Sequence, residues 1–119
     1  MRQVCLKRVY DAPAAEDGIR VLVDRLWPRG LKREHAGIDH WLKGVAPSAE
    51  LRRWFGHDVP RWFEFQQRYR AELRKNPRDL AILRGLLEGS GRLTLLFAAA
   101  DTERNNAVVL RDILMRDIK

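Results

Sequence analysis

The chain has 119 residues, enough for one domain with a single hydrophobic core, so we expect residues 1–119 to fold as one α/β unit. Lysine and arginine outnumber aspartate and glutamate by 23 to 16, and the net charge of +7 favours phosphates, nucleic acids or acidic proteins as partners. A single cysteine excludes an internal disulfide, and no apolar run is long enough for a signal peptide or a membrane span, so we expect a cytoplasmic protein without membrane contact.

Three segments have the pattern of β-strands, at residues 4–9, 20–26 and 92–98. The second and third carry continuous apolar runs, as strands buried on both faces do. The residues between these two strands are long enough for a helical crossover, so both strands are expected to run parallel. The connection over residues 11–18 is shorter than most parallel crossovers, which leaves the direction of the first strand open.

Four helices are predicted from capping residues and apolar spacing. Ser48 is expected to cap a helix that Gly56 ends, and a longer helix starts at residues 58–60. A third helix runs from Asn76 to near Gly89, and a C-terminal helix begins at Asp101, which would serve as its cap. The predicted fold class is therefore α/β, with a small, mainly parallel or mixed sheet of three to four strands flanked by about four to five helices.

The segment that follows the second strand is the strongest candidate for a binding site. Arg25 and Arg29 lie at the C-terminal end of this strand, where ligands bind in α/β folds. Pro28 and Gly30 favour a type I turn over residues 27–30, which would fix the direction of Arg29. Arginine forms bidentate hydrogen bonds to phosphate or carboxylate oxygens. Trp27, in the same turn, is a candidate wall for a base or ring.

Further candidates come from other segments of the chain. Lys43 and Arg52 would add cations to the same pocket, and Asp24 or Asp101 would hold an arginine in place. His57, followed by an aspartate, is a weak candidate for a general base, as is Asp24 for a proton carrier. Each has a structural alternative: an ion pair between Asp24 and Arg25, a helix cap at Asp101, and a helix junction at His57.

Other kinds of site are not indicated by the sequence. The three histidines lack the spacing of metal ligands, and neither a Walker nor a Rossmann glycine-rich loop is present, so no metal and no cofactor are predicted. Ser48 and Ser90 lack the context of a nucleophile elbow. Cys5 falls in a predicted strand and is expected to be a buried, inert thiol.

Several motifs, spread over nearly the whole chain, carry a resemblance to a known family. They are the segments 7–10, 17–30 with its run Asp-Arg-Leu-Trp-Pro-Arg-Gly, 41–43, 46–58, 62–69 and 94–99. The chain resembles the short bacterial members of domain-of-unknown-function family 488. The resemblance implies a small α/β fold with polar residues at one end of the sheet, and no settled activity.

The sequence also departs from that family after the third strand. Where relatives commonly carry a tyrosine, a lysine before the aspartate and a His-Asn turn, this chain has Phe97, Ala100-Asp101 and Arg104-Asn105-Asn106. Any reaction that uses that lysine or histidine is therefore not expected here.

The favoured function is a pocket for a phosphorylated or nucleotide-like anionic ligand at the C-terminal ends of the strands, with an enzymatic role left open. One alternative is a nucleic-acid-associated basic module, for which binding would be tighter than weak non-specific attraction. Another is a protein-interaction domain whose arginines are structural. The sequence does not specify the oligomeric state.

Overall fold

In the computed structural model, which describes residues 2–116, four strands form a single sheet. They are β1 (Gln3–Arg8), β2 (Ile19–Leu22), β3 (His40–Trp41) and β4 (Arg92–Phe97), in the order β1-β4-β2-β3. Every neighbouring pair is parallel, which confirms the predicted α/β class and gives the first strand its direction. With all strands parallel, their C-terminal ends share one edge of the sheet.

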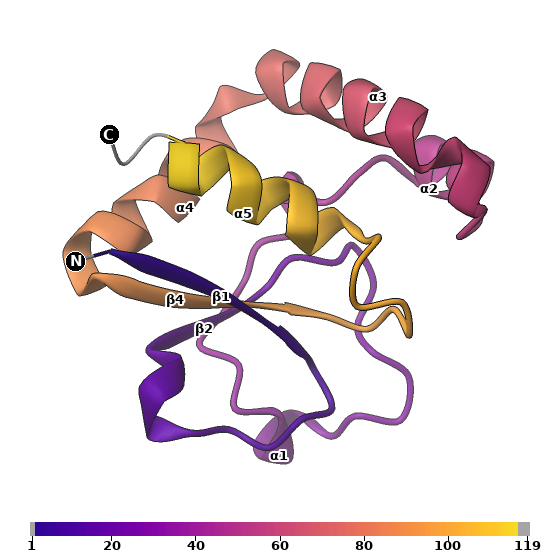
Figure 1. Cartoon of the computed structure of the whole chain (residues 1–119). Helices are drawn as coiled ribbons and strands as arrows, with labels where there is room; N and C mark the ends of the chain where they lie inside the picture. The colour runs from indigo at the N-terminus through magenta and orange to yellow at the C-terminus, as the bar shows by residue number, and fades with distance from the viewer. Residues whose placement is uncertain (1, 117–119) are drawn as a thin grey trace.

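The helices are unequally divided between the two faces of this sheet. They are α1 (Arg33–Ala36), α2 (Ala49–Phe55), α3 (Trp62–Lys75), α4 (Pro77–Ser90) and α5 (Asn106–Arg116), with short 3-10 turns η1 (Ala15–Asp17), η2 (Lys43–Val45) and η3 (Val59–Arg61). Figure 1 shows α3, α4 and α5 above the sheet, and α1 with its neighbouring loops below it. Within residues 2–116, no helix combines the length and hydropathy needed to cross a bilayer.

Helix boundaries in the middle of the chain follow the predicted caps. The Ser48 hydroxyl accepts a hydrogen bond from the Leu51 N–H at 3.1 Å, and α2 ends at Gly56, whose φ is +50°. This left-handed conformation is one that glycine adopts without strain. The predicted helix from residue 58 begins as η3 and continues directly into α3. Pro77 opens α4 as expected.

The C-terminal helix begins later than predicted. Asp101 accepts hydrogen bonds from the N–H groups of Glu103 and Arg104, at 2.9 and 3.0 Å, and so forms a turn in the loop before the helix. The Asn105 side-chain oxygen accepts the Val108 N–H at 3.1 Å, as an N-cap does, and α5 starts at Asn106. The expectation of an Asp101 helix cap was therefore wrong.

Three smaller expectations also differ from the structure. The second strand ends at Leu22, four residues early, and the turn after it closes between Pro28 O and Leu31 N at 3.3 Å. Gly30 has a φ of +78°, so the turn spans residues 28–31 and is not the predicted type I turn. Cys5 is exposed, because β1 is an edge strand and the core under the helices packs against the other face of this strand, at Val4 and Leu6.

Two hydrophobic clusters hold the layers together. The larger lies between the sheet and helices α2 to α5, with Leu83, Leu95 and Leu110 fully buried. The smaller one, on the α1 face, joins Leu22 and Leu96 to partly buried tryptophans. Burial of these side chains removes apolar surface from water on both faces, which is the main favourable contribution to folding.

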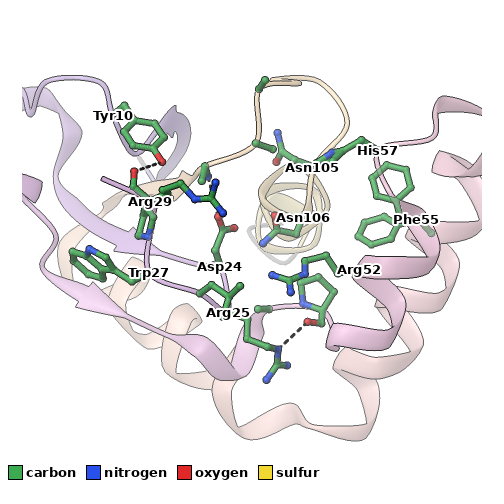
Figure 2. A pocket seen from close by; sticks show the side chains of 18 residues that line it. Tyr10, Asp24, Arg25, Trp27, Arg29, Arg52, Phe55, His57, Asn105 and Asn106 are labelled. Carbon is green, nitrogen blue, oxygen red and sulfur yellow. Dashed lines mark hydrogen bonds between the residues drawn. The ribbon is translucent and has the colours of Figure 1, made fainter. Parts of the chain in front are cut away.

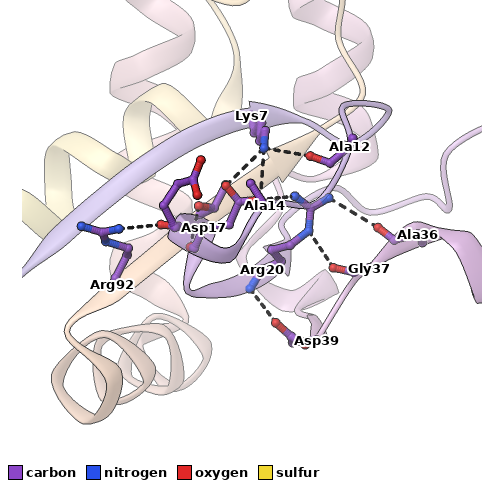
Figure 3. Close-up of polar contacts among 11 residues, drawn as sticks. Lys7, Ala12, Ala14, Asp17, Arg20, Ala36, Gly37, Asp39 and Arg92 are labelled. Atoms are coloured by element: carbon purple, nitrogen blue, oxygen red, sulfur yellow. Dashed lines mark hydrogen bonds and ion pairs between the residues drawn. The ribbon is translucent and has the colours of Figure 1, made fainter.

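On the α1 face of the sheet, buried charged side chains form an ionic network (Figure 3). Arg20 donates to Asp17 at 2.6 Å and to the Gly37 carbonyl at 2.7 Å, and Lys7 pairs with Asp17 at 3.1 Å. Burial disfavours the charged form of Asp17, but hydrogen bonds from Ala14 N–H, Arg20 and Lys7 outweigh this and lower its pKa. The network ties β1, β2 and the segment around α1 together.

Candidate functional site

A cavity of about 540 Å³ opens where β2 and β4 end (Figure 2). The segments after β1, β2 and β4 contribute to its wall, and α2, α3 and the start of α5 close it on the other side. The described residues that line it are Tyr10, Asp24, Arg25, Leu26, Trp27, Pro28, Arg29, Ala46, Pro47, Arg52, Phe55, His57, Phe65, Ala98, Ala99, Ala100, Asn105 and Asn106. The small alanines after β4 leave the space above the sheet edge open.

The loop after β4 is held in place by β1. Arg8 donates from Nε to the Ala99 carbonyl at 3.0 Å and from Nη2 to the Ala98 carbonyl at 2.8 Å. Arg8 also stacks over the ring of Tyr10, 5.1 Å from its centroid. These contacts fix the alanine segment as one wall of the cavity.

Asp24 lies in the middle of the cavity wall. Its Oδ2 accepts a hydrogen bond from the Ala98 N–H at 2.9 Å, which joins the ends of β2 and β4. Burial raises the pKa of this carboxyl group, and hydrogen bonds from Ala98 and Asn106 and the charge of Arg52 compensate only in part. A carboxylate whose cost of burial is only partly offset by hydrogen bonds and nearby charges is typical of functional sites.

Arg29 and Arg52 offer guanidinium groups on either side of Asp24 (Figure 2). Arg29 is fixed through its backbone, whose carbonyl accepts a hydrogen bond from the Tyr10 hydroxyl at 3.0 Å. Arg52 is carried by α2, and its charge acts on Asp24. Across the described part of the chain, no hydrogen bond or ion pair occupies either guanidinium group.

Arg25 has a structural contact that the other two arginines lack. Its Nε donates to the Pro47 carbonyl at 3.2 Å and so links the end of β2 to the start of α2. The alternative ion pair between Asp24 and Arg25 does not form within residues 2–116. Arg25 therefore lies at the rim of the cavity with part of its hydrogen-bonding capacity used.

Trp27 lines the cavity but faces the smaller hydrophobic cluster. Its indole N–H donates to the Leu31 carbonyl at 2.7 Å, and its ring meets Trp41 edge-on with centroids 5.4 Å apart. Arg33 stacks over the same ring at 4.9 Å. These contacts hold the ring in the turn, and the stacking role of Trp27 stays a prediction.

His57 stands at the opposite side of the cavity from Tyr10 (Figure 2). Its φ of +57° places it in the left-handed region directly after Gly56, and its ring lies 5.9 Å from that of Phe55. Asp58 pairs with Arg61 at 3.4 Å and caps no helix through its side chain. His57 therefore faces the cavity, and no carboxylate among residues 2–116 forms a hydrogen bond or ion pair with it.

Two predicted site residues lie outside the cavity wall. The Lys43 ammonium group stacks over the Trp41 ring, 4.1 Å from its centroid. Asp101 is held in its own turn by the N–H of Glu103, and an ion pair with Arg104 at 3.2 Å adds to the contacts that lower its pKa. Neither side chain lines the cavity, so their predicted role in binding stays a prediction.

The sequence argument missed Asn105 and Asn106 as cavity residues. Asn106 donates from Nδ2 to the Val23 carbonyl at 2.9 Å, so the start of α5 is joined to the end of β2. Asn105 donates to the Asp101 carbonyl at 2.9 Å. The signal was available, since asparagine directly before a run of apolar helical spacing is a common N-cap.

Comparisons with known proteins show the family of this chain. A model described as the inactive DUF488-N3 subclade matches residues 3–119. The chain belongs to the DUF488 family. The resemblance read from the motifs is thereby confirmed.

Bacterial relatives match almost end to end. The uncharacterized protein YeaO of Escherichia coli K12 is 43% identical over 108 residues, which cover 91% of this chain and 93% of YeaO. The uncharacterized protein Rv3073c of Mycobacterium tuberculosis H37Rv is 40% identical over 114 residues, with 94% and 93% covered. No solved structure gives a significant match.

Metal ligands do not gather in the described part of the molecule. Within residues 2–116, no group of three or more His, Cys, Asp or Glu side chains is placed to hold a metal ion. The polar side chains in the described lining of the cavity are guanidinium groups, one carboxyl group, amides, an imidazole and the Tyr10 phenol.

Proposed function

We propose that this DUF488 protein binds a phosphorylated or nucleotide-like anionic ligand in the cavity at the C-terminal edge of the sheet. The observation that carries the proposal is the pair Arg29 and Arg52, which face one cavity and have no hydrogen-bond acceptor among the described residues. A guanidinium group presents several N–H donors in a fixed plane that matches phosphate oxygens. The cavity volume of about 540 Å³ lies in the range of small-molecule sites.

The arginines of the molecule differ in a way that favours ligand binding over a structural role. Arg20 is buried and donates to Asp17 and two carbonyls, and Arg8 donates to two carbonyls. Arg29 and Arg52 make no comparable contacts with the described residues. Arg29 and Arg52 are exposed at the cavity, so their donors are open to solvent or to a ligand.

The proposal is of binding without turnover. The matching family model is described as an inactive subclade. The resemblance implies that Phe97, Ala100 and Arg104 replace a tyrosine, a lysine and a histidine of the family. Of the two residues suggested as proton carriers, His57 has no hydrogen bond or ion pair to a carboxylate in the part of the chain that the structure describes. Asp24 is held by Ala98 and is better placed to select the ligand than to move a proton.

Isothermal titration with inorganic phosphate and adenosine monophosphate tests this proposal directly. Arg29→Ala and Arg52→Ala should each weaken binding about tenfold or more, since one hydrogen bond to a charged group contributes about 1.5–3 kcal/mol. Arg53→Ala is the matched control, because Arg53 is exposed on α2 and does not line the cavity. Affinities that are equal in all three variants would refute the proposal.

A second candidate function is nucleic-acid binding through the basic surface. A smaller hollow of about 330 Å³ is lined by Arg70, Arg74 and Arg84, next to the apolar side chains of Leu73, Leu80 and Ile113. Fluorescence anisotropy with a labelled oligonucleotide at two salt concentrations measures this function. It requires a Kd below about 10⁻⁶ M at physiological salt and a loss of affinity in Arg70→Ala and Arg74→Ala.

A further inference from the structure

The position of Asp24 restricts which anion the cavity accepts. Figure 2 shows its carboxyl group between Arg29 on one side and Arg52 and Asn106 on the other. A ligand that contacts both guanidinium groups therefore meets the carboxyl group as well. This inference rests on the proposed function and deepens it, because it concerns the part of the ligand next to the phosphate.

An ionised carboxylate offers only hydrogen-bond acceptors. A phosphate oxygen placed against Asp24 is repelled, and the repulsion is stronger in a partly dehydrated site than in water. A ligand group that donates a hydrogen bond to Asp24 removes this conflict and gains a charge-assisted bond. The ligand must then carry a donor beside its anionic group.

The neighbouring side chains indicate that this donor is neutral. Asp24 is the one carboxylate in the described wall of the cavity, whereas three arginines line it. An ammonium group would be repelled by this excess of positive charge. The amides of Asn105 and Asn106 already donate to the Asp101 and Val23 carbonyls. The carboxyl group of Asp24 accepts the Ala98 N–H through Oδ2 and has acceptor capacity left for a hydroxyl group.

We propose that the ligand is a phosphorylated polyol or sugar, with a hydroxyl group next to its phosphate. The phosphate oxygens accept hydrogen bonds from Arg29 and Arg52, and the hydroxyl group donates to Asp24. A bare phosphate or an alkyl phosphate meets the same carboxylate without a donor and binds more weakly.

Glycerol 3-phosphate and n-propyl phosphate form a matched pair for the test, since they share the phosphate and the three-carbon chain and differ in hydroxyl groups. In isothermal titration, glycerol 3-phosphate should bind the parent protein about tenfold or more tightly than propyl phosphate. Asp24→Asn should bind propyl phosphate more tightly than the parent does and lose the preference for glycerol 3-phosphate. Asparagine keeps an acceptor for the Ala98 N–H, so the sheet edge is retained.

Glu88→Gln is the charge control, because Glu88 is exposed on α4 and its replacement removes the same negative charge far from the cavity wall. It should preserve the preference for glycerol 3-phosphate. Equal Kd values for the two ligands, with binding still lost in Arg29→Ala and Arg52→Ala, would overturn this inference and leave the proposed function standing. An unchanged preference in Asp24→Asn would also overturn it. Absence of binding by either ligand would refute both.

Discussion

Replacement of Asp17 by asparagine should destabilise the fold strongly, although the two side chains have nearly the same shape. The Asp17 carboxylate joins Arg20 and Lys7 on the α1 face of the sheet, and its side chain is only 8% exposed. The neutral amide of the Asp17→Asn variant would leave the buried Arg20 guanidinium, which is 5% exposed, without its counterion. The remaining contacts of Arg20, to the Gly37 and Ala36 carbonyls, do not neutralise this charge.

The magnitude follows from the cost of an unpaired buried charge. Removal of one partner from a buried ion pair costs about 3–5 kcal/mol. Asparagine still accepts a hydrogen bond from the Ala14 N–H, which places the expected loss near the lower end, about 3 kcal/mol. In a domain of this size about 1 kcal/mol shifts Tm by roughly 4 °C, so Tm should fall by about 12 °C.

Differential scanning calorimetry and urea unfolding measure this loss. The matched control is Glu64→Gln, which breaks the ion pair between Glu64 and Arg68 on the surface of α3, where the two side chains are 51% and 52% exposed. An exposed pair of this spacing contributes about 0.3–0.5 kcal/mol. A loss in Asp17→Asn no larger than that of the control would refute the assignment of the network as a source of stability.

The effect should also depend on pH. The pKa of Asp17 is lowered below its ordinary value of 3.8 in the folded state, so the unfolded state binds the proton more readily. The stabilisation is therefore complete above about pH 4 and is lost as pH falls through the folded pKa. The difference in Tm between the parent and Asp17→Asn should narrow on acidification over that range.

Three further stability predictions concern single positions. Asp24→Asn should raise the free energy of unfolding at pH 7, because burial raises the pKa of Asp24 above 3.8 and its ionisation opposes folding. The urea midpoints of the parent and the variant should differ at pH 7. They should converge below pH 3.8, where the carboxyl group is protonated in both the folded and the unfolded state. Gly18→Ala should cost about 2 kcal/mol or more in the same assay, since Gly18 has a φ of +65° and an added Cβ would lie 2.6 Å from the Arg92 carbonyl oxygen. Gly85→Ala, in the interior of α4, should instead stabilise by about 0.5–1 kcal/mol, since the added Cβ would meet no atom within 4 Å beyond its chain neighbours and the backbone of its own helix.

Much of the fold was predictable because its elements carry local signals. Ser48 and Gly56 mark the two ends of α2, and Pro77 opens α4. The apolar runs of β2 and β4 predicted the parallel pair at the centre of the sheet. These signals depend on backbone geometry and side-chain burial within a few residues, which a sequence shows directly.

The missed elements depend on contacts between distant segments. β3 has two residues, His40 and Trp41, and exists because it pairs with β2. α1 has four residues and lies against the buried side chain of Arg20, which donates to the Ala36 and Gly37 carbonyls at its end. Neither segment has a hydrophobic period of its own, so tertiary contacts alone determine its structure.

The candidate site was predictable only in part, because some of its residues follow a strong local signal and others are placed by contacts between distant segments. Arg25, Trp27 and Arg29 follow a strong strand, and the shared edge of a parallel sheet brings such segments together. The distance of Lys43 from the cavity, by contrast, depends on where its loop places it. A lone lysine gives no local signal for its stacking over Trp41.

The two aspartates Asp17 and Asp24 have the same carboxyl group, but their surroundings shift its pKa in opposite directions. Asp17 has two cationic partners and a backbone donor, and its pKa is lowered. Asp24 has a backbone donor, an amide and the charge of Arg52, and its pKa is raised. Selection for stability alone favours the first arrangement, because an under-compensated carboxylate opposes folding. The second arrangement lies in the wall of a cavity beside two arginines that have no hydrogen bond or ion pair among the described residues, and a ligand there would complete the compensation of the Asp24 charge. A ligand that donates to Asp24 should therefore stabilise the parent more than it stabilises Asp24→Asn.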